Sequence, residues 1–489
     1  MQKPPNFRRI VALLFSFLAL GLTIGCSKTA ETVPVTEKRD LNLDGALERY
    51  HSLLELPYSE ILGTSGFIIG IEKAPRDRIA FPSQSTVGDE NGIGANQYDQ
   101  QRLRPPSPTS DQVSDSDIDA QRQRFDGITS DGKVMFVSHI LSYRAGQGVD
   151  RIQPELLYTT FSQTGFSDSS PACGKATVAD AYAQGWRALD CLSDQIDRTM
   201  TDARRRGRPY THIFLLSMGW NNDQQESLRR YNAIVSQTLA AAQTNARDQD
   251  LNLLVIGITW PSVWGGTSIS QIINRGLHLF SYPAKTDDAD EIGFGIANKL
   301  MNGILPTLEQ KHDVHTVAIG HSMGARILSR AYYSSHMLVD AVDRTAETAP
   351  ILIGLQPAFS ANRFARGADP SLSFGNVRPG EGGPYQDHQL PGGLVALTWS
   401  QGDYANPLAR YLTGALHLGA EPGYSRAKQI NREGNVVFQF GTASNTGRAT
   451  ACPNDGKILL EDASAFILSH SDIQNAAVGR FVWSVMGCR

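Results

Sequence analysis

Residues 320–324 read GHSMG and match the G-x-S-x-G pattern of a nucleophile elbow, with Ser322 at its centre. In such an elbow a tight turn lifts the serine hydroxyl above a sheet edge, and the glycines keep side chains out of the turn. Because glycine and serine are common in this chain, the pattern has weight only between a strand and a helix. The apolar run Val314–Ile319 and the helical stretch Ala325–Tyr333 provide that setting. We therefore interpret Ser322 as a nucleophile.

A nucleophilic serine needs a general base, and the base needs an acid that orients it. After an elbow serine the acid comes first along the chain and the histidine second. Asp403 follows the apolar run Leu394–Thr398, and parallel-sheet enzymes place catalytic side chains at that end of a strand. The alternative acid is Asp387, which lies in a segment rich in Gly and Pro and is interpreted as a solvated loop residue.

Two histidines after Asp403 are candidates for the base. His470 precedes a final helix whose apolar face contains Ile473, Ala477, Phe481 and Val485. A loop between the last strand and the last helix is where the base of such a triad belongs. His417 falls in a helix-like segment, which indicates a packing or surface histidine. The expected triad is Ser322, Asp403 and His470.

Acyl transfer also needs two backbone N–H groups for the developing oxyanion. One is expected from Met323, the residue after the nucleophile. The other is expected from the loop at residues 217–222, which reads SMGWNN. Gly219 lets this backbone approach a substrate, and Trp220 N–H is the expected donor. An ordinary strand–helix turn is the alternative for this loop, because a main-chain donor has no side-chain signature.

The elements that must position these residues alternate regularly. Apolar strands are expected at Thr211–Leu216, Leu251–Thr259, Val314–Ile319, Ile351–Leu355 and Leu394–Thr398. Helical stretches separate most of them, including Gln225–Ala246 and Ala289–Leu305, and a long helix starts near Thr177. Further strands are expected at Gly66–Ile71, Val134–Leu141 and Val436–Phe440. Apolar strands alternating with helices indicate an α/β fold with a mostly parallel sheet covered on both faces.

With Trp260-Pro261-Ser262 after the second of these strands, the chain resembles an α/β-hydrolase. More narrowly, it resembles bacterial serine hydrolases with a His-Gly-Trp-Asn-Asn loop and a Trp-Pro-Ser motif, although Met218 stands where that group has His. The resemblance covers residues 210–485. It implies an α/β-hydrolase fold, the triad named above, and hydrolysis of an ester, thioester or related acyl bond without cofactor or metal. Acyl transfer to an acceptor other than water would use the same residues.

Two segments bear on the substrate. The apolar side chains between Pro261 and Ser281 form either a cap over the site or a layer packed on the sheet. The insertion Phe364–Gly393, rich in Gly and Pro, is a candidate for another pocket wall. Neither segment distinguishes a lipid from a short-chain ester.

The N-terminus predicts export. Lys3, Arg8 and Arg9 precede the apolar run Ile10–Ile24. A positive segment followed by about 15 apolar residues is typical of a secretory signal, whereas a membrane span needs about 20. An uncleaved signal anchor is the alternative.

The end of this run resembles a bacterial lipoprotein signal, in which a cysteine after a small residue is lipidated after cleavage. Here Gly25 precedes Cys26, and Thr23 occupies the place where that pattern usually has Leu. Ser27 follows the cysteine, rather than the Asp that would suggest inner-membrane retention. The resemblance implies a lipid-anchored protein of the bacterial cell envelope, on the outer membrane and facing the periplasm or the exterior.

Apart from Cys26, the cysteines are Cys173, Cys191, Cys452 and Cys488. An even number in an oxidising compartment suggests two disulfides. Four cysteines allow three pairings, and we prefer Cys173–Cys191 with Cys452–Cys488 because each would pin one end of the domain. No C-x-x-C spacing occurs, which disfavours a zinc site.

Composition bears on the class of partner. Lys and Arg total 45 against 49 Asp and Glu, which argues against a nucleic-acid binder with a basic surface. Hydrophobic residues make up 41% and charged residues 19%, so a packed core is expected. The expected partners are a small-molecule or lipid acyl substrate and, through the lipid anchor, a membrane.

The expected organisation is a signal peptide (1–25), a tether (26–60), an N-terminal strand with a polar insertion (61–130) and an α/β-hydrolase domain (131–489). A competing hypothesis is a non-catalytic envelope lipoprotein that uses a hydrolase scaffold for binding. Met218 and the polar stretch 81–127 favour it. The three triad candidates in the right order argue against it, because a binding module has no reason to keep them.

Overall fold

The computed structural model describes residues 61–75, 133–145, 152–161, 170–177, 180–220, 222–244, 251–262, 285–286, 288–338, 341–345, 348–365, 385–407, 415–434, 437–454 and 456–489. The expected signal peptide, Cys26, the tether and the polar insertion 81–127 lie outside these residues, as does most of the expected cap. Within the part that is described, none of the helices combines the length and the apolar character needed to cross a membrane.

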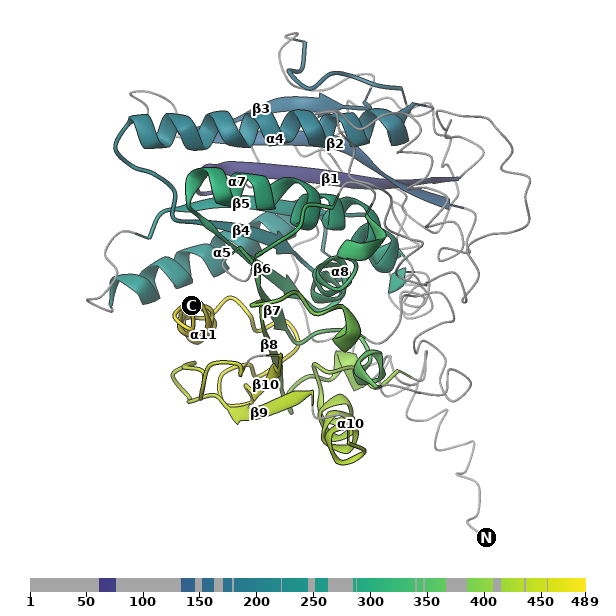
Figure 1. The fold of residues 1–489 in the computed structure, drawn as a ribbon, viewed down its shortest axis with the longest axis vertical. Helices are drawn as coiled ribbons and strands as arrows, with labels where there is room; N and C mark the ends of the chain where they lie inside the picture. The colour runs from purple at the N-terminus through teal and green to yellow at the C-terminus, as the bar shows by residue number, and fades with distance from the viewer. Residues whose placement is uncertain are drawn as a thin grey trace, which may run out of the picture.

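The described strands form one ten-stranded sheet in the order β3-β2-β1-β5-β4-β6-β7-β8-β10-β9 (Figure 1). The strands are β1 (Gly66–Pro75), β2 (Lys133–Ala145), β3 (Ile152–Thr159), β4 (His212–Ser217), β5 (Leu253–Thr259), β6 (His315–His321), β7 (Ile351–Leu355), β8 (Leu394–Trp399), β9 (Phe438–Thr442) and β10 (Ile458–Asp462). All pairs from β1 to β9 are parallel, whereas β2 is antiparallel to both β1 and β3. The predicted α/β class with a mostly parallel sheet is confirmed, and two antiparallel strands at one edge make the sheet mixed.

Helices cover both faces of the sheet (Figure 1). One face carries α4 (Ala181–Arg205), α7 (Leu305–His312) and α8 (Met323–Tyr332), and the other carries α5 (Gln224–Gln243) and α11 (Ala476–Met486). A further helix, α10 (Glu421–Arg432), packs against β9. The predicted arrangement of helices on both faces is therefore also confirmed.

Strand β4 shows why the sheet must be covered by helices on both faces. Ile213 and Leu215 belong to the core on one face, and Phe214 and Leu216 belong to the core on the other. All four side chains are fully buried. A strand whose successive residues are apolar on both faces has no face for water, which favours a central place in a parallel sheet.

The sequence did not predict β3, β10 or α10. Strand β3 reads IQPELLYT, and its proline is tolerated because β3 lies at a sheet edge. Strand β10 has five residues, of which the last two are acidic. Helix α10 is largely polar and buries only Gly423, Ala427 and Ile430, too few apolar positions for a clear periodic pattern.

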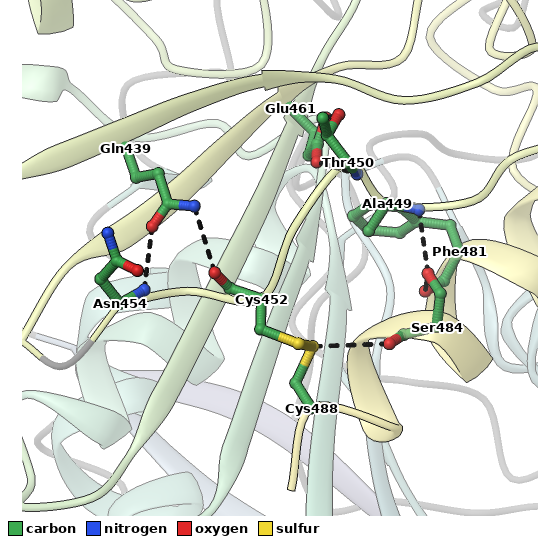
Figure 2. Close-up of a disulfide and its surroundings, with 9 residues drawn as sticks. All are labelled: Gln439, Ala449, Thr450, Cys452, Asn454, Glu461, Phe481, Ser484 and Cys488. Carbon is green, nitrogen blue, oxygen red and sulfur yellow. Dashed lines mark hydrogen bonds between the residues drawn. A yellow bond between two sulfur atoms is a disulfide. The ribbon is translucent and has the colours of Figure 1, made fainter.

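Two disulfides are formed, Cys173–Cys191 and Cys452–Cys488, which confirms the preferred pairing. Figure 2 shows the second bond, which ties the loop between β9 and β10 to the residue two places after α11. Gln439 in β9 donates a hydrogen bond to the carbonyl oxygen of Cys452 (3.1 Å) and so holds this loop against the sheet. The end of α11 is therefore covalently attached to the loop between β9 and β10.

Candidate active site

Ser322 lies in the sharp turn between β6 and α8. Its backbone angles are φ 55° and ψ −120°, which an L-residue adopts only under strain. The segment after β7 holds this turn from both sides. The Ser322 N–H donates to the carbonyl oxygen of Leu355 (3.0 Å), and Ala358 N–H donates to the carbonyl oxygen of Ser322 (3.1 Å). The structure thus places Ser322 in the strand–turn–helix setting that its sequence predicts.

Gly324 brings α8 into close contact with β4. A Cβ atom at this position would lie 2.1 Å from the carbonyl oxygen of Ser217, at the end of β4. This distance is far below any real carbon–oxygen contact, so a larger residue would push the helix and the turn away. The second glycine of the GHSMG motif is therefore required by packing.

His470 lies in the loop between β10 and α11, as predicted. The Ser322 hydroxyl and His470 Nε2 are 2.9 Å apart, and His470 Nδ1 is 2.9 Å from Asp403 Oδ2. The Asp403 side chain is fully buried, whereas the imidazole of His470 is 21% exposed. The three predicted triad residues thus form one hydrogen-bonded line, with the imidazole partly exposed and the carboxylate shielded from water.

Neighbouring strands bring the acid and base loops together. Asp403 follows β8 and His470 follows β10, and these strands are adjacent and parallel. Two hydrogen bonds join the loops directly: Ser400 Oγ donates to the carbonyl oxygen of Ile467 (2.5 Å), and Gln401 N–H donates to Ser464 Oγ (2.9 Å). The separation of Asp403 and His470 is therefore set by the sheet.

Asp403 accepts four hydrogen bonds. Its Oδ1 accepts from the backbone N–H groups of Ala405 and Asn406, both at 3.0 Å. Its Oδ2 accepts from the Asn406 side-chain amide (2.7 Å) and from His470 Nδ1 (2.9 Å). Donors on both oxygens fix the plane of the carboxylate and hence the direction from which it meets the imidazole.

His321, the residue before the nucleophile, also contacts the base. Its Nε2 donates to the carbonyl oxygen of His470 (2.8 Å), and the two ring centroids are 4.9 Å apart. Burial, followed by the nearby charges of His470 and Arg230, lowers the pKa of His321 well below its usual range. His321 therefore stays neutral and holds the loop of His470 without adding a charge beside that imidazole.

The predicted oxyanion loop is held by the Trp-Pro-Ser motif. Trp260 Nε1 donates to the carbonyl oxygen of Met218 (2.9 Å). Asn222 N–H donates to Ser262 Oγ (3.0 Å), and the same hydroxyl donates to the carbonyl oxygen of Asn222 (2.6 Å). The Met218 side chain itself is buried. Two motifs separated in sequence therefore form one unit, which is held through backbone groups.

The two expected oxyanion donors flank the nucleophile. Trp220 follows Gly219, whose backbone lies against the Ser322 side chain. Met323 is the first residue of α8, where a backbone N–H has no acceptor within the helix. The turn thus directs the N-terminal end of α8, which carries a partial positive charge, toward the region in which a negative charge would develop.

Asp387 and His417, the alternatives for the acid and the base, are not hydrogen-bonded to Ser322. Asp387 is exposed in the short 3-10 helix η8 (Tyr385–His388). The predicted helix at His417 is wrong, because His417 forms an isolated bridge with Ser360; the expected packing histidine is confirmed, because its side chain is buried. His417 Nδ1 is 3.1 Å from Asn406 Oδ1, and the Asn406 amide donates to Asp403, so His417 is linked to Asp403 through Asn406 and not to Ser322.

Sequence reasoning missed Gln356 and Asn406. Gln356, just after β7, has a φ of 46°, donates from its N–H to Thr398 Oγ1 (3.0 Å) and accepts from Asn406 Nδ2 (3.1 Å). Both residues are ordinary polar residues in loops and match no motif. His321 lies inside GHSMG, so attention to the variable positions of the motif could have found it.

Among the described residues, no group of three or more His, Cys, Asp or Glu side chains is placed to hold a metal ion. Compared with models of known protein families, the chain matches none. A comparison with curated proteins likewise finds no match.

Proposed function

We propose that this protein is a serine hydrolase of the α/β-hydrolase type that cleaves a carboxylic ester or a related acyl bond through an acyl-enzyme. The observation that carries this proposal is the line from Ser322 Oγ to His470 Nε2 and from His470 Nδ1 to Asp403 Oδ2, with both hydrogen bonds at 2.9 Å. A serine, a histidine and a buried carboxylate in this order form a general-base-activated nucleophile. The strained turn at Ser322, which is typical of a nucleophile elbow, supports the same proposal.

In the first half of the proposed reaction, Ser322 Oγ attacks the acyl carbon while His470 Nε2 takes the hydroxyl proton. The carbonyl π electrons move to oxygen, and the N–H groups of Trp220 and Met323 stabilise the oxyanion. The oxyanion then collapses, the bond to the leaving group breaks, and His470 gives its proton to the departing alcohol or thiol. The product is an ester of Ser322. Asp403 fixes the imidazole tautomer and stabilises its positive charge.

In the second half, water takes the place of the leaving group. His470 removes a proton from the water as its oxygen attacks the acyl carbon. Collapse of the second oxyanion breaks the bond to Ser322 Oγ, which regains its proton from His470, and a carboxylic acid is released. An alcohol or amine acceptor in place of water would yield acyl transfer by the same steps.

The rim of the site favours an apolar acyl group. Within the described part of the chain, the exposed large hydrophobic side chains are Tyr404 (78% exposed) and Leu468 (69% exposed). Tyr404 directly follows the acid, and Leu468 lies two residues before the base. Gly402 brings the two loops into backbone contact, because a Cβ there would lie 2.2 Å from the Leu468 carbonyl oxygen. We therefore propose esters of medium or long acyl chains as substrates.

We also propose that the protein is exported and anchored by a lipid on Cys26. The sequence around residues 10–26 supports this, and the two disulfides are consistent with an oxidising compartment. Replacing Cys26 by Ala should release the protein from membranes into the periplasmic fraction. Persistent membrane association of that variant would favour an uncleaved signal anchor.

The proposed activity is tested by labelling with a fluorophosphonate probe. Wild-type protein should be labelled, Ser322→Ala should not, and Ser236→Ala should be labelled like the wild type, because Ser236 is an exposed residue of α5. A series of p-nitrophenyl esters of increasing chain length then tests the substrate class. Absence of labelling in a folded wild type would overturn the proposal and favour a scaffold that binds its partner without catalysis.

A further inference from the structure

We propose that His417 and Asn406 are positioning residues for the triad acid: His417 fixes the Asn406 side chain so that its amide donates to Asp403. These two side chains extend the triad into a line of five, from His417 through Asn406, Asp403 and His470 to Ser322. The kinetic part of this inference rests on the proposed hydrolase function. Its structural part concerns the hydrogen bond between His470 and Asp403 and does not need turnover.

The contacts of Asn406 allow one orientation of its amide. Nδ2 lies 3.1 Å from the carbonyl oxygen of Gln356 and 2.7 Å from Asp403 Oδ2, and both of these atoms only accept hydrogen bonds. Rotating the amide by half a turn would place its oxygen against two other oxygens, one of them negatively charged. The Asn406 Oδ1 therefore faces His417 and accepts a hydrogen bond from it.

His417 must then carry a proton on Nδ1. Its Nδ1 is 3.1 Å from Asn406 Oδ1, which has no proton to give. Burial, followed by the charges of Arg326 and Arg363, lowers the pKa of His417 to about 3, so the ring is neutral at ordinary pH. A neutral imidazole has one N–H, and this contact assigns it to Nδ1.

The backbone around His417 is fixed. Residues 416–419 run beside residues 357–361: Ala361 N–H donates to Leu416 O (3.0 Å), Leu418 N–H to Phe359 O (3.1 Å) and Gly419 N–H to Pro357 O (3.0 Å). A Cβ at Gly419 would lie 2.4 Å from Asn406 Nδ2. This segment can therefore approach the amide only because residue 419 is glycine.

The contacts of Asp403 predict the effect of losing the hydrogen bond from the Asn406 amide. Without the Asn406 amide, Asp403 Oδ2 accepts only from His470, and the carboxylate is held by the two backbone donors on Oδ1 alone. It can then tilt relative to the imidazole. By comparison with other outer residues that orient a reacting group, we expect kcat to fall about 10-fold with KM unchanged.

The experiment compares His417→Phe, which removes the donor but fills the space, with His417→Asn, whose amide can replace Nδ1. His212→Phe is the matched control, since His212 lies at the start of β4, whereas Ser322, Asp403 and His470 follow the carboxyl ends of parallel strands, at the other end of the sheet. Two quantities are measured in the full chain: kcat and KM for an ester, and the downfield proton resonance of His470 Nδ1–H. His417→Phe should lower kcat and shift that resonance upfield, His417→Asn should restore both, and His212→Phe should change neither.

A wild-type kcat together with an unshifted resonance in His417→Phe would overturn the proposal. If His417→Phe does not fold, Asn406→Ala is measured instead, since water can fill the space that the amide leaves. An unshifted His470 Nδ1–H resonance in Asn406→Ala would also overturn the proposal. If the wild type hydrolyses no ester, the proposed function fails, and the resonance still tests the positioning separately. If the wild type hydrolyses the ester normally and neither His417→Phe nor Asn406→Ala changes kcat or the resonance, this inference is rejected and the hydrolase proposal stands.

Discussion

Gly219 and Ser322 are in contact, and the contact excludes a side chain on the oxyanion loop. A Cβ atom at position 219 would lie 2.6 Å from the Ser322 Cβ and 3.0 Å from its Oγ. Since the Ser322 turn is itself held by Leu355 and Ala358, the nucleophile cannot move aside without loss of those hydrogen bonds. The loop would have to withdraw, and the expected Trp220 donor would withdraw with it.

Gly219→Ala should therefore reduce fluorophosphonate labelling and ester hydrolysis by on the order of 100-fold, the cost of a displacement of about 1 Å at a reacting centre. Gly487→Ala is the control, because the nearest atom to a Cβ there is 3.6 Å away. Thermal unfolding should show both variants to be folded. Full activity of Gly219→Ala would mean that this loop does not border the reaction.

Asp403→Asn should give a folded protein whose turnover is lower by about 10⁴-fold, because a neutral amide neither enforces the tautomer of His470 nor stabilises its charge. Asp387→Asn is the control, and its exposed position predicts no change. The measurement is kcat for the best ester substrate of the wild type. Unaltered turnover of Asp403→Asn would transfer the acid role to Asp387 or to another residue.

The two disulfides should contribute unequally to stability. Their cysteines are separated by 18 and 36 residues, and the chain-entropy relation assigns about 3 kcal/mol to Cys173–Cys191 and about 4 kcal/mol to Cys452–Cys488. Replacing each pair by Ser and measuring guanidinium unfolding should give losses in this order. Mass spectrometry of unreduced peptides should find all four cysteines bridged; free thiols would count against the export model.

Buried histidines predict a loss of stability in acid. The pKa of His417 is lowered to about 3 by burial and then by Arg326 and Arg363, and burial lowers that of His212 to about 4. In the unfolded chain both groups titrate near 6.5. Below that pH the unfolded chain binds protons that the folded protein does not, so the free energy of unfolding falls as the pH falls from about 6.5 toward 4.

Each of these histidines should contribute a slope of about 1.4 kcal/mol per pH unit in the lower part of that range. His212→Phe should therefore flatten the curve of unfolding free energy against pH between 5.5 and 4.5 by roughly that amount. Denaturant unfolding at several pH values measures it. Equal slopes in the wild type and in the variant would show that His212 is protonated in the folded state as well.

The parts of the site that could be predicted from the sequence are those in which local signals agree. An apolar strand, two glycines around Ser322 and a following helix occur within one short stretch, so the strand–turn–helix setting of Ser322 could be predicted before the fold. Asp403 and His470 could be identified from chain order and from their places next to regular elements. Their mutual distance could not, because it depends on the adjacency of β8 and β10, and β10 was too short and too acidic to be recognised.

The supporting residues had no comparable signal. The sequence around His417 is helix-like, whereas this segment is paired with residues 357–361 through long-range hydrogen bonds. Glu461 shows the same limit: this carboxylate is fully buried and accepts from both the N–H and the hydroxyl of Thr450. Such partners lie in distant or separate segments, and no periodic pattern records them.

The position of His470 has a consequence for the order in which the molecule is made. His470 lies 148 residues after Ser322, and its loop leads into α11, whose end the Cys452–Cys488 bond attaches to the loop between β9 and β10. A nascent chain that already displays the serine turn still has no group to deprotonate it. The bond at the C-terminal end also requires an oxidant. In the proposed mechanism, Ser322 can therefore react only after the loop that carries His470 has folded against it.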